Sequence, residues 1–435
     1  MEAIIRQAID FLCAYEMDHH DIDFDDHIKR FLREMEAGLA GLPSSLEMIP
    51  TYLQAVNQIP VGRRVIAADA GGTNVRVAAV YFDENKKPVI ENLRTFSMPA
   101  VESELSRIAF FDAMAGYFAG VLDASEKIGF CFSYPTEITA NRDGRLIRFA
   151  KEIKAPEVVG QMVGENLNLA IGRLGLGGAK HIVLLNDTVA ALLSGVGFQN
   201  RQYSSYIGFI LGTGTNCAYI ESNANIAKQE GLDPRQSQII NTESGGMAKA
   251  HWGQIDRQFD ASTTNPGVHF FEKMISGAYL GPLFLTVLHR ACRDGLLSGG
   301  AAKAIGQLSD LSTKQMNAFM LYPCGSNPLA GALAGGTSQD AVLAYVIADR
   351  LVERAAKLAA VNLSAMAVKC GQGTNPACPI CIVAEGTTFY QMKTLKSRVE
   401  FYLKQHLENQ RGIYTEIIGV EHAALIGAAI AGLTN

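Results

Sequence analysis

The sequence has little charge and no long apolar segment. Charged residues make up 19% of the 435 residues, the net charge is −5, and Lys and Arg form no run, which argues against a nucleic-acid surface. The longest apolar run, 423–433, is far shorter than the roughly 20 residues of a membrane-spanning helix. The N-terminal segment carries Glu2 and Asp10 and lacks the basic and apolar regions of a signal peptide. We therefore expect a cytoplasmic protein with neither nucleic-acid nor membrane partners.

Cysteine is sparse, and no disulfide framework is indicated. The eight cysteines are scattered along the chain, which fits a reducing compartment. Cys378 and Cys381 form a CxxC motif with Cys370 nearby, but no His lies close, and three thiols are an incomplete tetrahedral zinc set. We expect Cys378 and Cys381 to be free of metal and to take no part in catalysis.

The remaining composition is that of an ordinary globular enzyme. Hydrophobic residues make up 48% of the chain, and its length predicts two or three domains with ample core. The first sixty residues or so are expected to be helical, with Asp25 and Asp26 as capping candidates and Pro43 as a stop. The apolar residues that support this helix recur at spacings of three and four: Ile28, Phe31, Leu32, Met35, Leu39 and Leu42.

The rest of the chain divides into strand-rich and helix-rich parts. Residues 65–185 favour strands, and a helix follows at 189–195. From about Phe270 onward helical patterns dominate, apart from a strand at 380–384. Further expected features are strands at 128–133 and 181–185, a turn at Asp143-Gly144, and surface loops at 294–301 and 331–338.

Two hairpins carry more polarity than their turns require. Residues 65–80, VIAADAGGTNVRVAAV, place Asp, two Gly, Thr, Asn and Arg between apolar strands. Residues 206–221, YIGFILGTGTNCAYIE, repeat this design, and both centres end on Gly-Thr-Asn. Glycine lets backbone N–H groups approach a phosphate closely, and Thr and Asn add neutral donors. Either hairpin alone is compatible with an unrelated turn, but the pair predicts two lobes that hold a polyphosphate between them.

Asp69 lies within the first polar centre. A carboxylate at that place is suited to Mg²⁺, held through water, beside the phosphates. The P-loop pattern GxxxxGK[ST] is absent, which argues against a P-loop kinase.

Asn186 and Asp187 stand between the two hairpins, where a strand ends and a helix begins. The simplest interpretation is a helix N-cap, because Asn, Asp and Thr all serve there. A functional interpretation is compatible with it: the helix N-terminus keeps Asp187 ionised, and its carboxylate can accept a proton from a hydroxyl. A weak base suffices for the loose transition state of phosphoryl transfer.

These motifs resemble those of the hexokinase/glucokinase family. FLREMEAGL and LEMIPTY resemble its N-terminal segments, DAGGTNVR and ILGTGTNCAYIE its two phosphate motifs, and VAEGTTFY its adenosine motif. GFCFSYP with GRLIRFAKEIKA, NTESGG and NPGVHFFEKMISGAYLG resemble its sugar-binding segments. The resemblance is dense over 31–281, returns at 351–390, and is interrupted at 294–345 and in the last twenty residues.

The resemblance implies an α/β, two-lobed actin-like ATPase fold (ribonuclease H-like) with a cleft between the lobes. The small lobe is expected at 64–186 plus 419–435 and the large lobe at 1–63 plus 187–418. The implied activity is transfer of the γ-phosphoryl group of ATP, with Mg²⁺, to the 6-hydroxyl of a hexose such as glucose. A catalytically silent sugar sensor is the alternative. A second group of bacterial sugar kinases is disfavoured because its Cys/His zinc motif is missing.

The resemblance also implies roles for individual residues. Asp187 would be the catalytic base and Asp69 the Mg²⁺ ligand. The hexose would be bound by Ser133, Lys151, Asn186, Asp187, Asn216, Glu243 and Glu272. The nucleotide would be bound by Asp69, Gly71, Gly72, Thr73, Asn74, Arg76, Gly212, Thr213, Gly214, Gly386 and Thr387.

Four departures from the family pattern bear on specificity. Ser244 stands where the family has Trp, Ala150 where it has Thr, and Glu385 where it has Asp. The C-terminal Gly-Ser-Gly-Lys-Gly run is replaced by GVEHAALIGAAIAGL. These changes bear on hexose preference and nucleotide contacts, not on the class of reaction.

Overall fold

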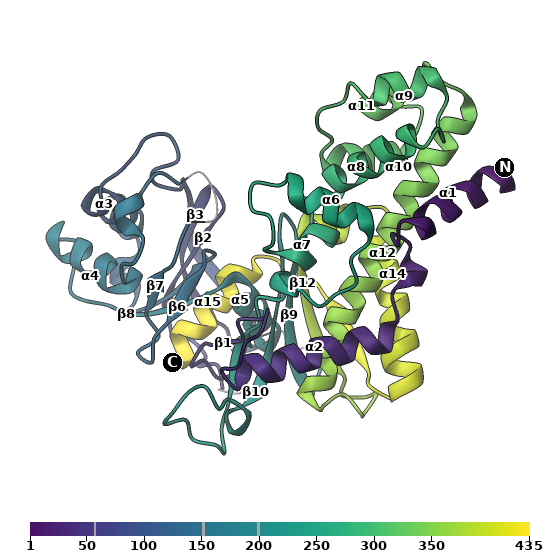
Figure 1. Cartoon of the computed structure of the whole chain (residues 1–435). Helices are drawn as coiled ribbons and strands as arrows, with labels where there is room; N and C mark the ends of the chain where they lie inside the picture. Colours follow the sequence, from purple (N-terminus) through teal and green to yellow (C-terminus); the bar gives the residue numbers. More distant parts are fainter. Residues whose placement is uncertain (56–57, 150–152, 198–200) are drawn as a thin grey trace.

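Two large sheets organise the chain (Figure 1). The computed structural model describes residues 1–55, 58–149, 153–197 and 201–435. The five-stranded sheet has the order β4-β3-β2-β5-β8 and the six-stranded sheet the order β1-β11-β10-β9-β12-β13. The strands of the first are β2 (Val65–Gly71), β3 (Asn74–Phe82), β4 (Pro88–Ser97), β5 (Lys127–Phe132) and β8 (His181–Leu185). Those of the second are β1 (Ile49–Pro50), β9 (Ser205–Leu211), β10 (Thr215–Ser222), β11 (Ser237–Asn241), β12 (Ile380–Glu385) and β13 (Thr415–Ile418). A small ribbon joins β6 (Thr136–Ile138) to β7 (Gly144–Leu146).

The two sheets share one topology. In the first, the antiparallel hairpin β2–β3 is extended by β4 on one side and by the parallel strands β5 and β8 on the other. In the second, the hairpin β9–β10 is flanked in the same way by β11 and by β12 and β13. The two glycine-rich hairpins therefore occupy equivalent positions in the two sheets.

Helices cover the sheets and build a helical extension. In Figure 1, α3 and α4 lie beside the five-stranded sheet, and α8 to α11 gather at the far end of the other half. The helices are α1 (Glu2–Ala14), α2 (Phe24–Leu39), α3 (Arg107–Phe118), α4 (Val163–Arg173), α5 (Asp187–Gly197), α6 (Gln254–Ser262), α7 (Phe270–Ile275), α8 (Leu280–Arg293), α9 (Gly299–Ile305), α10 (Thr313–Leu321), α11 (Pro328–Leu333), α12 (Ser338–Cys370), α13 (Thr387–Gln391), α14 (Leu395–Leu403) and α15 (Ala423–Thr434).

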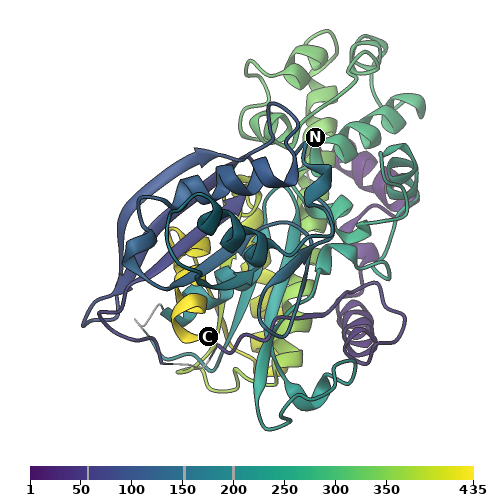
Figure 2. The same cartoon turned by 90° about the vertical axis from the view of Figure 1, so that its left-hand side faces the viewer.

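Helices α5 and α15 pack together between the two sheets (Figure 2). Helix α15 contacts β2, β5 and β8, whereas α5 contacts β9, β10 and β12. Glycine permits this close approach: a Cβ on Gly427 would lie 1.9 Å from the carbonyl oxygen of Ala190, and one on Gly208 would lie 2.0 Å from that of Thr188. The backbone at the start of α5 is thereby held against the second glycine-rich hairpin.

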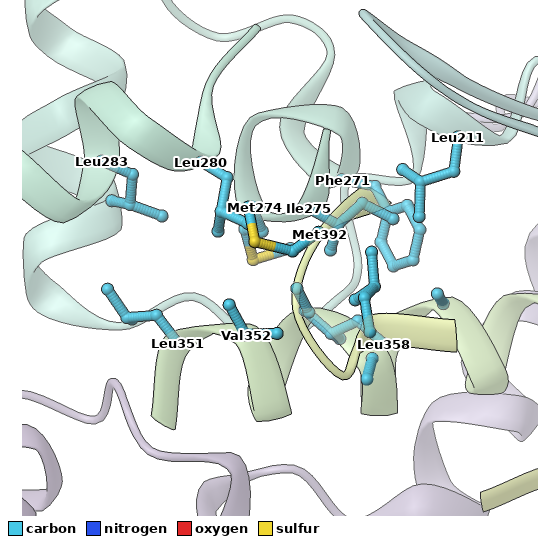
Figure 3. Packing of buried hydrophobic residues seen from close by; sticks show 14 of the residues in the cluster. Leu211, Phe271, Met274, Ile275, Leu280, Leu283, Leu351, Val352, Leu358 and Met392 are labelled. Atoms are coloured by element: carbon cyan, nitrogen blue, oxygen red, sulfur yellow. The ribbon is translucent and has the colours of Figure 1, made fainter. Parts of the chain in front are cut away.

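The largest apolar cluster lies around α12. Leu351, Val352 and Leu358 of this helix face α7 and α8, with Leu280 and Leu283 on the opposite side (Figure 3). All five side chains are buried. Burying such a side chain contributes about 1.5–3 kcal/mol, so this cluster fixes α7, and with it the segment around Glu272, on the core.

Most predicted strands are confirmed. Both hairpins form, and the strand at 181–185 has the predicted bounds. The strand predicted at 128–133 begins and ends one residue earlier, and the strand predicted at 380–384 ends one residue later. The helix predicted at 189–195 begins two residues earlier, at Asp187.

Several local predictions were wrong. The N-cap of α2 is Asp23, whose carboxylate accepts the N–H of Asp26, and the helix ends at Leu39, leaving Leu42 exposed. The region 65–185 also holds α3 and α4, whose apolar faces pack on the five-stranded sheet rather than pairing as strands. The expected loops at 294–301 and 331–338 overlap α9, α11 and the start of α12; the side chains of Asn327 and Thr337 cap α11 and α12, and Ser298 is the N-cap residue of α9.

The division into lobes with boundaries at 63/64, 186/187 and 418/419 remains a prediction. Cys381 is buried within β12, and Cys378 is half-buried just before it. The metal-free state of these two cysteines also stays a prediction.

Within the ranges described, no helix combines the length and apolarity needed to cross a membrane.

Candidate active site

One cavity of about 930 Å³ lies between the two hairpins. Its wall takes residues from both sheets and from α5, α7 and the start of α15. Predicted site residues on this wall are Asp69, Gly71, Gly72, Arg76, Ser133, Asn186, Asp187, Thr213, Gly214, Asn216, Glu243 and Glu272.

The topology explains why these residues meet. Strands β2, β5 and β8 are parallel, and their carboxyl ends carry Gly71, Ser133 and Asn186. Strands β9 and β12 are also parallel and end near Gly212 and Gly386. Parallel strands end at one edge of a sheet, where ligands of open α/β sheets bind. Here two such edges face one cavity.

The first hairpin turns tightly at Gly72, whose φ of +63° suits glycine. The Tyr134 hydroxyl donates to the Gly72 carbonyl at 2.8 Å and so fixes the turn. Asp69 and Arg76 are register partners, and Arg76 Nη1 lies 3.4 Å from Asp69 Oδ2. The exposed guanidinium and the turn are thus available to an anion at the cavity.

The second hairpin is bound to the segments behind it. The carbonyl of Gly212 accepts the N–H of Gly277 at 2.8 Å and the hydroxyl of Thr388 at 2.9 Å. A Cβ on Gly386 would lie 2.2 Å from the Leu211 carbonyl oxygen, so glycine lets β12 end directly beside the hairpin. Gly212 and Gly386 therefore meet backbone to backbone.

Asn186 and Asp187 begin helix α5 at the cavity wall. Asn186 Oδ1 and Asp187 Oδ1 accept the Thr188 N–H at 2.9 and 2.8 Å. Helix α5 begins at Asp187, so Asn186 is the N-cap residue, and the Asp187 carboxylate lies in the first turn of the helix on the cavity wall.

A network of amides orients Glu243. Asn216 Nδ2 donates to Asn241 Oδ1 at 2.7 Å, and Asn241 Nδ2 donates to Glu243 Oε1 at 2.9 Å. Glu243 has a left-handed backbone with φ of 53°. A non-glycine residue held in that region marks a constrained site. Asn241 was missed by sequence reasoning, although it begins the quoted segment NTESGG.

Glu272 reaches the second hairpin from helix α7. Its Oε2 accepts the N–H of Thr215 at 3.0 Å. His269, at the N-cap of α7, has φ of 54° and also lines the cavity. The short helix thus presents a fixed carboxylate beside the glycine-rich turn.

Burial raises the pKa of several carboxyl groups around the cavity. It raises the pKa of Asp69 to about 6, where Asp187 adds repulsion and Arg76 opposes the shift. It raises the pKa of Glu243 to about 7 and that of Glu385 to about 7. Burial also raises the pKa of Glu272, against the hydrogen bond from Thr215. The cavity therefore gathers carboxyl groups whose ionised forms are disfavoured by burial and would be stabilised by a bound cation or by hydroxyl donors.

Not every predicted residue lies on this wall. Thr73, Gly212 and Gly386 lie on the adjoining turns, Asn74 begins β3 and Thr387 begins α13; within the described part of the chain, these five residues neighbour the wall without lining it. Lys151 and Ala150 fall outside the described residues. Arg148, Asn265 and His422 line the wall but were not predicted as site residues. Arg148 and Asn265 lie within the segments quoted as resembling sugar-binding segments, and His422 lies within the divergent C-terminal run.

The chain matches hexokinase family models over most of its length. One model described as Hexokinase matches residues 12–196 and another 206–434. Hexokinase-7 of Oryza sativa subsp. japonica is 30% identical over 424 residues, 92% of this chain and 88% of that protein. Hexokinase-1 of Homo sapiens is 30% identical over 66% of this chain but 32% of its own length.

Solved structures agree on the fold. The hexokinase from Schistosoma mansoni complexed with glucose superimposes with a TM-score of 0.77 at 23% identity, over 99% of each chain. A glucokinase from an Antarctic psychrotroph has a TM-score of 0.53 at 17% identity, over 85% of this chain and 98% of that one. The chain thus has the two-lobed actin-like ATPase fold, belongs to the hexokinase family and is an ATP-dependent hexose kinase.

Proposed function

We propose that this kinase phosphorylates the 6-hydroxyl of a hexose, D-glucose above all and also mannose and fructose, as the entry step of glycolysis. The observation that carries the proposal is the single cavity that joins Asp187 to two glycine-rich hairpins and to the Asn216–Asn241–Glu243 network. A hexose offers a ring of hydroxyl groups that each donate and accept, and amides and carboxylates are their natural partners.

The sugar would lie between the two halves of the cavity. Ser133 and Asn186 approach from the five-stranded sheet and from its junction with α5; Asn216, Glu243 and Glu272 approach from the other half. Ionised Glu243 and Glu272 would accept hydroxyl protons in charge-assisted hydrogen bonds, which are stronger than neutral ones. Lys151 is proposed as a further donor from the sequence alone.

Asp187 would remove the proton of the attacking hydroxyl. Its carboxylate stands on the cavity wall at the N-terminus of α5, whose dipole favours the anion. In a loose phosphoryl-transfer transition state positioning and charge stabilisation dominate, so a modestly basic carboxylate is adequate.

The two hairpins would hold the phosphates of ATP from opposite sides, with Arg76 as a cationic contact. Asp69 fits a Mg²⁺ ion because it is a hard oxygen donor whose raised pKa reflects burial among other carboxyl groups with Arg76 opposing. When bound, the ion supplies charge neutralisation at the phosphate oxygens. Gly71, Gly72, Thr213 and Gly214 would contribute backbone N–H groups and close approach.

We expect hexose affinity to weaken in acid. The pKa of Glu243 is raised to about 7, so lowering the pH through that value protonates the carboxylate that would accept sugar hydroxyls. One unit below the pKa only about a tenth of such groups stay ionised. The measurement is the hexose KM across neutral and mildly acidic pH, alongside Glu243→Gln. The wild-type KM should rise as the pH falls. The KM of the Gln variant should already be high at neutral pH and should change less with pH. A pH-independent wild-type KM would contradict the assignment.

Substrate choice is tested by coupled ADP release with a panel of hexoses. Glucose is expected to give the highest kcat/KM, and NMR of the product should place the phosphate on O6. Faster turnover of another hexose, or no turnover of any, would refute the proposed substrate.

Ala150→Thr restores the hydroxyl of the family pattern, and a neutral hydrogen bond contributes about 0.5–1.5 kcal/mol, or two- to twelvefold in affinity. A severalfold lower glucose KM in this variant would support sugar binding at that segment.

A further inference from the structure

A buried polar pair stands directly behind the predicted sugar-binding residues. Ser244 follows Glu243, is completely buried and occupies the position where the family pattern has Trp. Asn362 of α12 is also completely buried, and its Nδ2 donates to Ser244 Oγ at 3.1 Å. Because the serine side chain is much smaller than that of tryptophan, Asn362 of the facing helix can contact residue 244.

Burial of the Asn362 side chain at this position lowers the stability of the protein. Its neighbours on the helix, Val361 and Leu363, are fully buried apolar residues of the main core. Asn362 Oδ1 has no hydrogen-bond partner within the described chain, so one of its two polar atoms is buried unsatisfied. Burial of an amide without full pairing destabilises a protein. The hydrogen bond from Asn362 to Ser244 is therefore retained in spite of a cost in stability, and this points to a role for the bond.

Ser244 is linked to the sugar-binding network through its backbone. Its N–H donates to Asn216 Oδ1 at 3.2 Å, and the same oxygen accepts the Cys217 N–H at 2.7 Å. These two bonds orient the Asn216 amide so that Nδ2 points to Asn241 Oδ1 at 2.7 Å and toward Glu243 Oε1 at 3.4 Å. A shift of Ser244 would therefore move the donors that orient Glu243.

The backbone of the turn that contains Ser244 is also constrained by its own hydrogen bonds and packing. Glu243 precedes it in the left-handed region, and the Gly246 N–H donates to the Glu243 carbonyl at 3.0 Å. A Cβ on Gly245 would lie 2.8 Å from the Thr215 carbonyl oxygen, so the turn is pressed against β10. Cys217 lies buried against both Ser244 and Asn362. The pair thus joins the core helix to a tightly packed turn.

We propose that Asn362 is a positioning residue of the hexose site: through Ser244 it holds the turn at 243–246 and so aligns Asn216 and Glu243 with the sugar. This inference rests on the proposed hexose-binding role of those two residues. It assigns to α12 a function in substrate affinity, although that helix does not line the cavity.

The test compares Asn362→Leu, which keeps a similar shape without the donor, with Ser244→Ala, which removes the acceptor. Loss of a neutral hydrogen bond should raise glucose KM and the calorimetric glucose Kd about two- to twelvefold. The kcat and the ATP KM should change little. Ser364→Ala is the matched control, because Ser364 is equally buried two residues further along α12 and its Oγ has no partner in the described chain; its glucose KM should remain at the wild-type value.

The double variant Ser244→Ala/Asn362→Leu separates positioning from mere packing. Neither side chain is then left unpaired, so thermal stability should recover relative to the single variants, while the glucose KM should stay raised. The proposal would be overturned if the melting temperature and the glucose KM of the double variant both returned toward the wild-type values. It would also be overturned if the single variants had a lowered melting temperature but an unchanged glucose Kd. Absence of glucose turnover in the wild-type enzyme would instead contradict the proposed substrate.

Discussion

Replacing Asp187 by Ala is expected to lower kcat for hexose phosphorylation by about 10²- to 10⁴-fold, the range that loss of a general base produces. The folded enzyme should still bind glucose, because Asn216, Glu243 and Glu272 are untouched. The measurement is steady-state turnover together with calorimetric glucose binding. A kcat within a fewfold of wild type would exclude Asp187 as the base.

The matched variant is Asp187→Asn. Asp187 Oδ1 accepts the Thr188 N–H at 2.8 Å in the first turn of α5, so Ala also removes a hydrogen-bond acceptor, which typically costs about 0.5–1.5 kcal/mol. Asn retains an oxygen for this bond but does not act as a base. We expect the Asn variant to keep the melting temperature of the wild type and to lose as much kcat as the Ala variant. A near-normal kcat in the Asn variant with a low kcat in the Ala variant would indicate that this hydrogen bond, not proton transfer, is what matters.

Replacing Gly214 by Ala is expected to raise the glucose KM by about 10- to 150-fold. The new Cβ would lie 2.5 Å from Glu272 Oε2, so the carboxylate must move and lose its 3.0 Å bond from the Thr215 N–H. A Glu272 carboxylate displaced in this way would also lose its proposed bond to a sugar hydroxyl, and a hydrogen bond to a charged group contributes about 1.5–3 kcal/mol, which corresponds to that range in affinity. Loss of the Thr215 bond should also lower the melting temperature.

Gly212→Ala is the control on the same hairpin. Its Cβ would meet only Gly386 Cα, at 3.5 Å, an ordinary contact. The glucose KM of this variant should therefore match the wild type, whatever happens to ATP affinity. Equal glucose KM values for the two alanine variants would show that Glu272 does not depend on the space beside Gly214.

The sequence alone predicted the elements whose signal is local. The hairpins at 65–82 and 205–222 are readable because apolar alternation brackets glycine-rich centres, and the strand at 181–185 because it is short, apolar and followed by Asn and Asp. Helices α3 and α4 were missed because residues around them suggested strands, while their own apolar residues serve a helix face packed on the sheet. Capping at Asp23 rather than Asp25 or Asp26 depends on one backbone geometry that periodicity does not specify.

Residue chemistry and order therefore determined the family, the fold and the two glycine-rich hairpins, since these depend on motifs that are continuous in the chain. The tertiary structure decided which residues share the cavity. Asn241, His269 and His422 reach its surroundings only because parallel strands end at one edge and because α15 returns to the first sheet. The Asn362–Ser244 bond spans 118 residues, and no spacing rule predicts it. Contacts of that kind arise from packing, where burial and shape decide what meets, rather than from any local preference of the chain.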